Sequence, residues 1–271
     1  MGMLETIAAR RSVRSFDGRA LAPEARARLQ ALLDGARNPY GLPVRFFLLD
    51  GREKRLSSLV ISGTELWLAG KLRRAPHAEE AFGFAMQEIL LRAEEALGIG
   101  AVWLAGTLSR NAFEAAVDLQ AGEVLPCVSP IGYPAERMSL RETVMRKGTG
   151  AAARLPFGTL FFEGSFDRPL SPEAAGDAVP LLEAVRRAPS AVNRQPWRVV
   201  RDGNAFHFYE RRSRGCVDKT GWDLQKIDLG IALCHFALAA EALGREAVFS
   251  QEDPGLRAPE NTSYLASYLL R

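Results

Sequence analysis

Two segments of the 271-residue sequence carry side chains of the types that bind charged or aromatic ligands. Near the N-terminus, residues 10–16 read RRSVRSF, which gathers three arginines around a serine: Arg10, Arg11, Ser12 and Arg14. Phosphate groups are bound well by planar guanidinium groups, which can donate two parallel hydrogen bonds each. The segment therefore indicates an anion site, although a solvated, charged turn is also consistent with this composition.

The second segment, residues 188–198, reads APSAVNRQPWR and places a hydroxyl and two amides in one loop. The polar side chains of Ser190, Asn193 and Gln195 can donate hydrogen bonds to the edge of a heteroaromatic ring and accept hydrogen bonds from it. Packing of Trp197 would explain a fixed loop, but it would not require these three polar side chains together. We therefore interpret the loop as a second part of a ligand site.

The other chemically capable residues form weaker patterns. None of the three histidines, His77, His207 and His235, has a carboxylate or cysteine at metal-ligand spacing, so each is expected on the surface or in the core. The three cysteines are scattered without a CxxC pair, which argues against disulfides and structural zinc and fits a reducing cytosol. Because GxSxG, P-loop and GxGxxG sequences are missing, a serine hydrolase or a Rossmann dehydrogenase has no support.

The composition is that of an ordinary globular protein. Hydrophobic residues make up 47% and charged residues 25%, which excludes extensive disorder. The net charge is only +3, and most of the 35 basic residues are spread along the sequence rather than gathered into a basic stripe, so no nucleic-acid partner is expected. The longest apolar run, residues 230–240, is about half as long as a membrane span, and the N-terminus has no signal-peptide pattern. We expect a cytoplasmic protein with no membrane partner.

The elements that must position the two segments repeat along the chain. Residues 92–103 read RAEEALGIGAVW and residues 238–249 read LAAEALGREAVF, so that seven residues are identical at an offset of 146. Upstream of each copy, residues 43–46 (PVRF) correspond to residues 196–199 (PWRV). A favourable helix ending explains the shared Leu-Gly pair alone, but the matching order of the surrounding segments predicts an internal duplication.

Hydrophobic spacing predicts the elements of each copy. Apolar residues three and four apart, followed by Gly98, predict a helix over residues 79–97, and a nearly continuous apolar run predicts a buried helix over residues 227–243. Short apolar runs predict strands at residues 45–50, 160–162, 197–201 and 205–209. The predicted fold class is α+β, with two similar lobes, residues 1–160 and residues 161–271, that pack on each other as a dimer made from one chain.

Together, the two segments resemble the two signatures of the flavin-dependent nitroreductase family. Three further stretches are similar to family segments that occur in the same order: residues 98–107 (GIGAVWLAGT), 130–136 (PIGYPAE) and 153–162 (ARLPFGTLFF). Residues 226–236 (KIDLGIALCHF) resemble a fused, duplicated, single-chain branch of the family. The resemblance covers most of the chain and implies a nitroreductase-like fold that binds FMN.

The resemblance implies flavin contacts position by position. For the first lobe it implies contacts to the flavin phosphate and pyrimidine edge from Arg10, Arg11, Ser12 and Arg14. It also implies that the main-chain amides facing flavin N5 belong to Ala105, Gly106 and Thr107. A basic pair that binds the phosphate corresponds to Arg154 and to position 152, where Ala152 replaces the expected lysine. Either the phosphate contact is weaker than in the family, or Arg137 or Lys147 compensates for the missing lysine.

The second lobe is implied to close over the flavin with Ser190, Asn193 and Gln195. The corresponding first-lobe stretch, residues 36–44, lacks the glutamine and the tryptophan, and the second lobe has no RRSxR sequence of its own. Each half thus retains what the other lacks, which predicts one FMN per chain between the lobes. Because the family's dimer interface would lie within one chain, we expect the protein to be mainly a monomer.

The function implied by the resemblance is that of an FMN-dependent oxidoreductase. NAD(P)H would reduce the flavin at N5, and a small-molecule acceptor such as a nitroaromatic or a quinone would reoxidise it in a ping-pong scheme. The flavin carries the chemistry, so no catalytic side chain is expected. The alternative is a flavin-binding or regulatory protein without turnover, which Ala152 and the loss of one cleft would favour.

Overall fold

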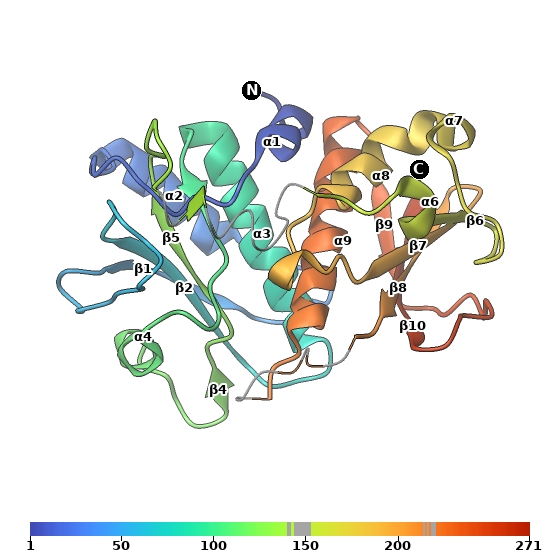
Figure 1. Cartoon of the computed structure of the whole chain (residues 1–271). Helices are drawn as coiled ribbons and strands as arrows, with labels where there is room; N and C mark the ends of the chain where they lie inside the picture. Colours follow the sequence, from blue (N-terminus) through green and yellow to red (C-terminus); the bar gives the residue numbers. More distant parts are fainter. Residues whose placement is uncertain (140–141, 144–152, 214, 216, 218–220) are drawn as a thin grey trace.

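Two β-sheets lie on either side of a pair of long helices in the computed structural model, which describes residues 1–139, 142–143, 153–213, 215, 217 and 221–271 (Figure 1). The two helices are α3 (Ala78–Leu97) and α9 (Leu224–Ala242), which pack along each other between the sheets. The shorter helices are α1 (Met3–Ala9), α2 (Pro23–Gly35), α4 (Arg110–Ala116), α6 (Phe157–Leu160), α7 (Pro172–Ala175) and α8 (Val179–Arg186). The α+β class predicted from the sequence is confirmed.

The two sheets share one strand order. The first sheet runs β1 (Arg45–Asp50), β2 (Leu66–Arg73), β5 (Val128–Gly132) and β3 (Gly100–Ala101), with β4 (Glu123–Val124) paired to the end of β2. The second sheet runs β6 (Phe161–Glu163), β7 (Trp197–Asp202), β8 (Ala205–Arg211), β10 (Thr262–Leu270) and β9 (Ala247–Ser250). These neighbours are antiparallel except β6 and β7, which are parallel. Strands β1, β2, β5 and β3 therefore correspond in order to β7, β8, β10 and β9.

The long helices lie close to their predicted bounds. Helix α3 begins one residue before the predicted start and ends where Gly98 adopts a left-handed φ of 65°. Helix α9 begins three residues before the predicted start, because the side chain of Asp223 accepts a hydrogen bond from the main-chain nitrogen of Gln225 at 3.1 Å. This N-terminal cap was the signal that the sequence interpretation missed.

Glycine is required where α3 and α9 cross. A Cβ atom at Gly83 would lie 2.1 Å from the main-chain oxygen of Ile227, and one at Gly230 would lie 2.0 Å from the main-chain oxygen of Glu80. The contacts are reciprocal, because the glycine of each helix faces a carbonyl of the other. The two glycines are 147 residues apart, and so are the two residues whose carbonyls they face. Two helices that each carry a glycine at the contact can approach more closely than side chains would otherwise allow.

A fully buried histidine, His235, lies within α9. Its Nδ1 is 2.9 Å from the main-chain oxygen of Ala184, which can only accept, so Nδ1 carries the proton. Burial lowers the pKa of His235 to about 3, and the positive charges of Arg10 and Arg154 act in the same direction. Between about pH 6.5 and about pH 3 the unfolded chain therefore binds a proton that the folded chain excludes. The free energy of unfolding must rise with pH across this window.

We expect His235 to make the protein less stable as the pH falls below 6.5. Its contribution to the slope of the unfolding free energy should approach about 1.4 kcal/mol per pH unit. The substitution His235→Gln keeps one donor and one acceptor at this position but does not titrate, so it should reduce the slope. Urea unfolding of both proteins over a series of pH values measures the difference. Equal slopes would contradict a neutral, buried His235.

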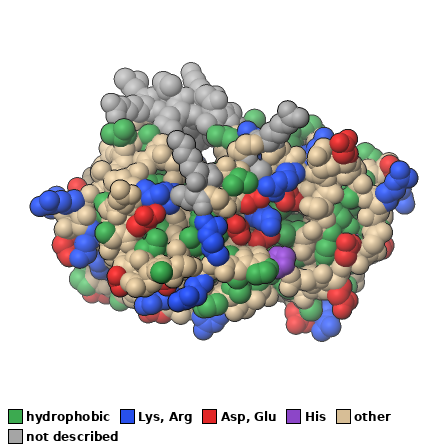
Figure 2. Space-filling view, turned by 90° about the horizontal axis from the view of Figure 1, so that it is seen from below, with side chains coloured by type: hydrophobic (Ala, Val, Ile, Leu, Met, Phe, Trp, Pro, Cys, Tyr) green, Lys and Arg blue, Asp and Glu red, His purple; other side chains and the backbone are tan. Residues whose placement is uncertain are grey.

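The surface seen in Figure 2 carries interspersed charges of both signs rather than a continuous basic stripe. Among the described residues, no helix combines the length and the apolar character that crossing a membrane requires. Within the same residues, no group of His, Cys, Asp and Glu side chains is arranged to hold a metal ion. Cys127 and Cys234 are buried, and Cys216 lies outside the described part of the chain.

Candidate functional site

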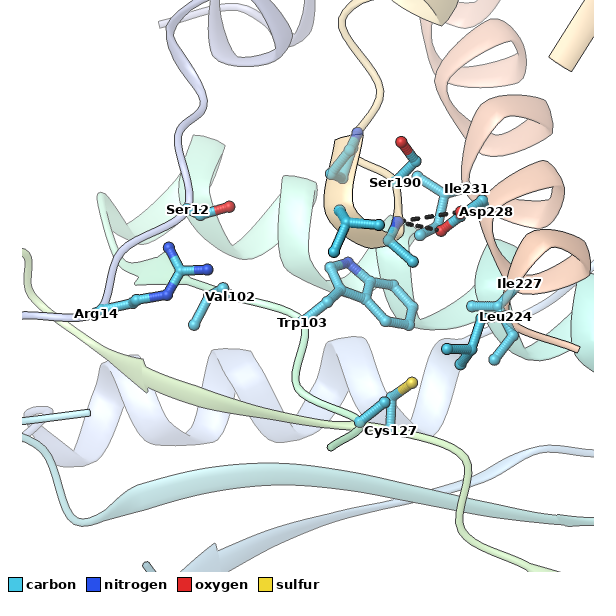
Figure 3. Close-up of a pocket in the computed structure, with 14 residues that line it drawn as sticks. Ser12, Arg14, Val102, Trp103, Cys127, Ser190, Leu224, Ile227, Asp228 and Ile231 are labelled. Atoms are coloured by element: carbon cyan, nitrogen blue, oxygen red, sulfur yellow. Dashed lines mark hydrogen bonds between the residues drawn. The ribbon is translucent and has the colours of Figure 1, made fainter. Parts of the chain in front are cut away.

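A groove lies where separate stretches of the chain meet between the two sheets (Figure 3). It comprises two adjoining cavities of about 210 and 250 Å³. Both cavities are lined by Ser12, Arg14, Trp103, Ala105, Pro189, Ser190 and Val192. One cavity continues into a cationic end, which is lined by Arg10, Gly106, Thr107, Arg154 and Asn193. The other continues into an apolar end against α9, which is lined by Cys127, Leu224, Ile227, Asp228 and Ile231.

The N-terminal segment presents Ser12 and Arg14 to the groove because its backbone is extended. Alternate side chains of an extended chain point to opposite sides, so the intervening Val13 is buried. The main-chain nitrogen of Val13 donates to the oxygen of Ala101 at 2.9 Å, which attaches the segment to β3. The close approach requires Gly100, because a Cβ atom there would lie 2.6 Å from Cγ2 of Val13.

The turn after β3 is held in place by two sets of hydrogen bonds. Leu104 is buried and exchanges two main-chain hydrogen bonds with Val128, each 2.9 Å long. The guanidinium of Arg110 donates to the main-chain oxygen of Ala105 at 2.9 Å. Trp103 and Ala105, on either side of Leu104, line the groove. The turn therefore places the Trp103 side chain and the main chain of residue 105 at the groove.

The loop on the opposite wall has an unusual backbone. Val192, Asn193 and Gln195 have φ values of 46°, 56° and 51°, in the left-handed region. Valine rarely adopts this conformation, and such strain costs about 1–3 kcal/mol and clusters at functional sites. Hydrogen bonds maintain the loop: the main-chain nitrogen of Gln195 donates to Oγ of Ser190 at 2.9 Å, and its Oε1 accepts from the nitrogen of Leu155 at 3.0 Å.

Helix α9 anchors this loop through one carboxylate. Asp228 accepts from the main-chain nitrogen of Ala191 with both oxygens, at 2.9 and 3.0 Å (Figure 3). Burial raises the pKa of Asp228 well above its usual range, while the hydrogen bond from Ala191 opposes that rise. Asp228 belongs to a helix face whose members are three and four residues apart, namely residues 224, 227, 228 and 231. This face of α9 forms the apolar end of the groove.

The cationic end gathers the positive charges of Arg10, Arg14 and Arg154. Arg154 donates to the main-chain oxygens of Ala153 and Arg187 at 2.8 and 3.3 Å, and to Oδ1 of Asn193 at 3.5 Å. Burial lowers the pKa of Arg154, and the charges of Arg187 and Arg186 lower it further. The surroundings of Arg154 thus disfavour additional positive charge. The same field would stabilise an anion in the groove.

Nine of the eleven site residues predicted from the sequence line this groove: Arg10, Ser12, Arg14, Ala105, Gly106, Thr107, Arg154, Ser190 and Asn193. The other two do not. Arg11 donates to the buried carboxylate of Glu142 at 3.3 Å. The side chain of Gln195 accepts from the main-chain nitrogen of Leu155 and donates to the main-chain oxygen of Asn193. Ala152 lies outside the described residues. That any of these residues contacts a flavin stays a prediction.

The sequence interpretation missed the apolar end and two residues that line the groove, Trp103 and Asp228. A signal for each was present. Trp103 lies two residues before Ala105 in a stretch already assigned to the site, and Asp228 is a carboxylate inside a nearly continuous apolar helix. A charged residue in such a helix indicates a specific buried partner, because an unpaired buried charge is strongly unfavourable.

The fold and the groove define a protein of the nitroreductase class. The structure of a "putative nitroreductase" from Thermotoga maritima matches with a TM-score of 0.63 over 99% of this chain and 94% of that one, at 22% sequence identity, which shows a shared fold. The chain belongs to the family described as "Putative TM nitroreductase", whose sequence pattern matches residues 2–240. The family resemblance identified in the sequence is confirmed.

Other nitroreductase structures match about half of the chain. An "FMN-dependent Nitroreductase" from Clostridium difficile R20291 has a TM-score of 0.42 and 18% identity, covering 49% of this chain and 88% of that one. A "putative nitroreductase in complex with FMN" from Desulfovibrio desulfuricans has a TM-score of 0.41 and 22% identity, covering 52% of this chain and 94% of that one. No curated protein matches the sequence.

Proposed function

We propose that the protein is an FMN-dependent oxidoreductase that binds one FMN in the groove. The observation that carries the proposal is the division of one continuous groove into a cationic end and an aromatic, apolar end. Guanidinium groups suit the flavin phosphate, and an indole beside the apolar face of α9 suits a planar ring. The side chains present therefore fit the chemistry of FMN as well as the family to which the chain belongs.

In this assignment the two halves contribute different functions. Arg10, Arg14 and Arg154 hold the anionic part of the cofactor, while Ser190 and Asn193 close the groove from the other side. Bound FMN would supply an N5 atom that accepts a hydride and passes electrons on. The main-chain amides of residues 105–107 belong to a turn that Arg110 holds through the oxygen of Ala105. They would stabilise negative charge on the reduced ring.

We further propose NAD(P)H as the electron donor and a small molecule of the nitroaromatic or quinone type as the acceptor. Gly106 and Thr107 are exposed at the cationic end, so the groove communicates with solvent there. A donor and an acceptor that use this one opening in turn would follow a ping-pong scheme. The family supplies the class of reaction, and the pairing of donor and acceptor is our inference.

We also propose that the chain is an intrachain pseudo-dimer that arose by duplication, with lobes of residues 1–160 and 161–271. Three observations support this: the shared strand order of the two sheets, the reciprocal glycine contacts of α3 and α9, and the repeated sequence around residues 98 and 244. The groove takes its N-terminal arginines from one half and its closing loop from the other. A single chain thus contains a complete groove, so a monomer is sufficient for function.

The first-half counterpart of the closing loop, residues 36–44, supports one groove per chain. Its Tyr40 stacks on His77 with ring centroids 5.0 Å apart, and it meets Phe249 edge to face at the same centroid distance. In this loop an aromatic side chain therefore packs against the protein, whereas Ser190 and Asn193 line a groove.

The test of the proposed function is reduction of the FMN-loaded protein by NADH or NADPH in the absence of oxygen. We expect the visible absorbance of the flavin to fall and a nitroaromatic or a quinone to restore it. Free FMN at the same concentration is the control for reaction in solution. A tightly bound flavin that neither nicotinamide reduces would reject the oxidoreductase and favour the alternative, a flavin-binding protein without turnover.

A further inference from the structure

A continuous chain of hydrogen bonds leads from the groove into the contact between α3 and α9. Trp103, which lines the groove, donates from Nε1 to Oε1 of Gln87 at 2.8 Å. The side-chain nitrogen of Gln87 lies 3.0 Å from Nε2 of His235. Nδ1 of His235 lies 2.9 Å from the main-chain oxygen of Ala184 on α8. This series of hydrogen bonds therefore crosses from the first half of the molecule into the second.

The two ends of this chain fix the direction of every hydrogen bond in it. An indole N–H can only donate, and a main-chain carbonyl can only accept. His235 must therefore carry its proton on Nδ1 and accept at Nε2. Gln87 must present its oxygen to Trp103 and its amide N–H to His235. Gln87 is 1% exposed and His235 is 0% exposed, so water does not compete for these groups.

We propose that Gln87 and His235 are positioning residues that hold the Trp103 indole as a fixed wall of the flavin groove. The proposal rests on the proposed FMN site, because it concerns how that site is prepared for a planar ring. Apart from this chain, Trp103 meets Phe82 edge to face with ring centroids 6.1 Å apart. The hydrogen bond from Gln87 fixes the rotation of the indole, which this apolar contact alone does not specify.

A neutral His235 is part of the arrangement. With a second proton on Nε2, the N–H of His235 would face the amide N–H of Gln87. The Gln87 amide would then have to turn its oxygen toward His235 and away from Trp103. Burial and the positive charges of Arg10 and Arg154 keep the pKa of His235 low. The arginines of the cationic end therefore favour the protonation state that holds the indole at the other side of the groove.

The test is a double-mutant cycle in FMN affinity. Gln87→Met keeps the length of the side chain but cannot bridge Trp103 and His235. We expect it to weaken FMN binding about threefold to tenfold, because the indole must then be ordered when the ligand binds. In a Trp103→Phe background, which has no indole N–H to hold, Gln87→Met should leave the dissociation constant unchanged.

A conservative variant and a matched control separate positioning from general stability. Gln87→Glu keeps an oxygen for Trp103 and can share one proton with His235, so it should bind FMN as the wild type does. Ser267→Ala removes a buried hydrogen bond of 2.7 Å to His207 in the second sheet, together with one of 2.8 Å to the hydroxyl of Tyr264. It should lower stability without changing FMN affinity. If Gln87→Met does not fold, His235→Leu removes the far anchor and should weaken FMN binding in the same way.

A second measurement does not require the flavin. The indole N–H resonance of Trp103, assigned by its loss in Trp103→Phe, should shift in the apoprotein of Gln87→Met. Wild-type FMN affinity in Gln87→Met, or an equal loss in the Trp103→Phe background, would overturn the proposal. Failure of the wild type to bind FMN would instead reject the proposed function, and the indole resonance would still report whether Gln87 anchors Trp103.

Discussion

Replacement of Arg14 or Arg154 by alanine should weaken FMN binding by about tenfold to a hundredfold. Each guanidinium lines the cationic end of the groove. A charge-assisted hydrogen bond from such a group is worth about 1.5–3 kcal/mol, and a tenfold change in affinity corresponds to about 1.4 kcal/mol. Titration of the apoprotein with FMN, followed by flavin fluorescence, measures both the dissociation constant and the number of sites, which should be one per chain.

Three further substitutions control this experiment. Arg37→Ala removes an exposed arginine from the first-half loop, where it donates to the main-chain oxygen of Ala36, and should not change FMN affinity. Arg11→Ala should cost less than Arg14→Ala, because Arg11 pairs with Glu142 instead of lining the groove. Asn193→Ala should also weaken FMN binding less than Arg14→Ala, since it removes a neutral side chain rather than a charged one. Two sites per chain, or wild-type affinity in both Arg14→Ala and Arg154→Ala, would contradict our assignment of the groove.

Gly230→Ala should lower the free energy of unfolding by about 1–3 kcal/mol or more. The added Cβ atom would lie 2.0 Å from the main-chain oxygen of Glu80, and a main-chain atom cannot rotate away as the end of a side chain can. Helices α3 and α9 must then separate, and the apolar core on both sides must repack. Urea unfolding followed by circular dichroism measures the loss.

Gly35→Ala is the matched control for this substitution. Gly35 is the last residue of α2, and a Cβ atom there would meet no atom within 4 Å. Because alanine is favoured over glycine in a helix, this variant should be as stable as the wild type or more stable. If Gly230→Ala also kept wild-type stability, the close crossing of the two helices would not depend on glycine.

Elements could be predicted from the sequence where the hydrophobic spacing and the ending signal both lie within the element itself. Helix α3 is such an element, because its buried positions and its ending at Gly98 are local features. Strand β2 was missed because its sequence, LWLAGKLR, does not alternate between apolar and polar residues. Six of its eight residues are buried, since both faces of the strand are covered. Even Lys71 is buried there, 2.7 Å from the carboxylate of Glu123 on β4, a partner that only the folded sheet supplies.

The candidate site could be predicted where its residues are close together in the sequence. The arginines near residue 12 and the polar loop after Pro189 are such cases, and the structure brings them to one groove. The apolar end could not be predicted, because it depends on how α9 packs against the 102–107 turn. Residue type also does not reveal when a polar side chain already makes a hydrogen bond within the protein. Arg11 is an example, because its partner Glu142 is 131 residues away in the sequence.

The left-handed backbone of the closing loop has a consequence for the thermodynamics of ligand capture. Val192, Asn193 and Gln195 lose their conformational entropy when the chain folds, before any ligand arrives. A ligand that enters the groove therefore meets a loop that is already ordered, and its binding free energy is not reduced by ordering that loop. The entropy lost in ordering the loop lowers the stability of the ligand-free fold. In these few residues, a gain in affinity for the ligand therefore comes with a loss of stability of the empty protein.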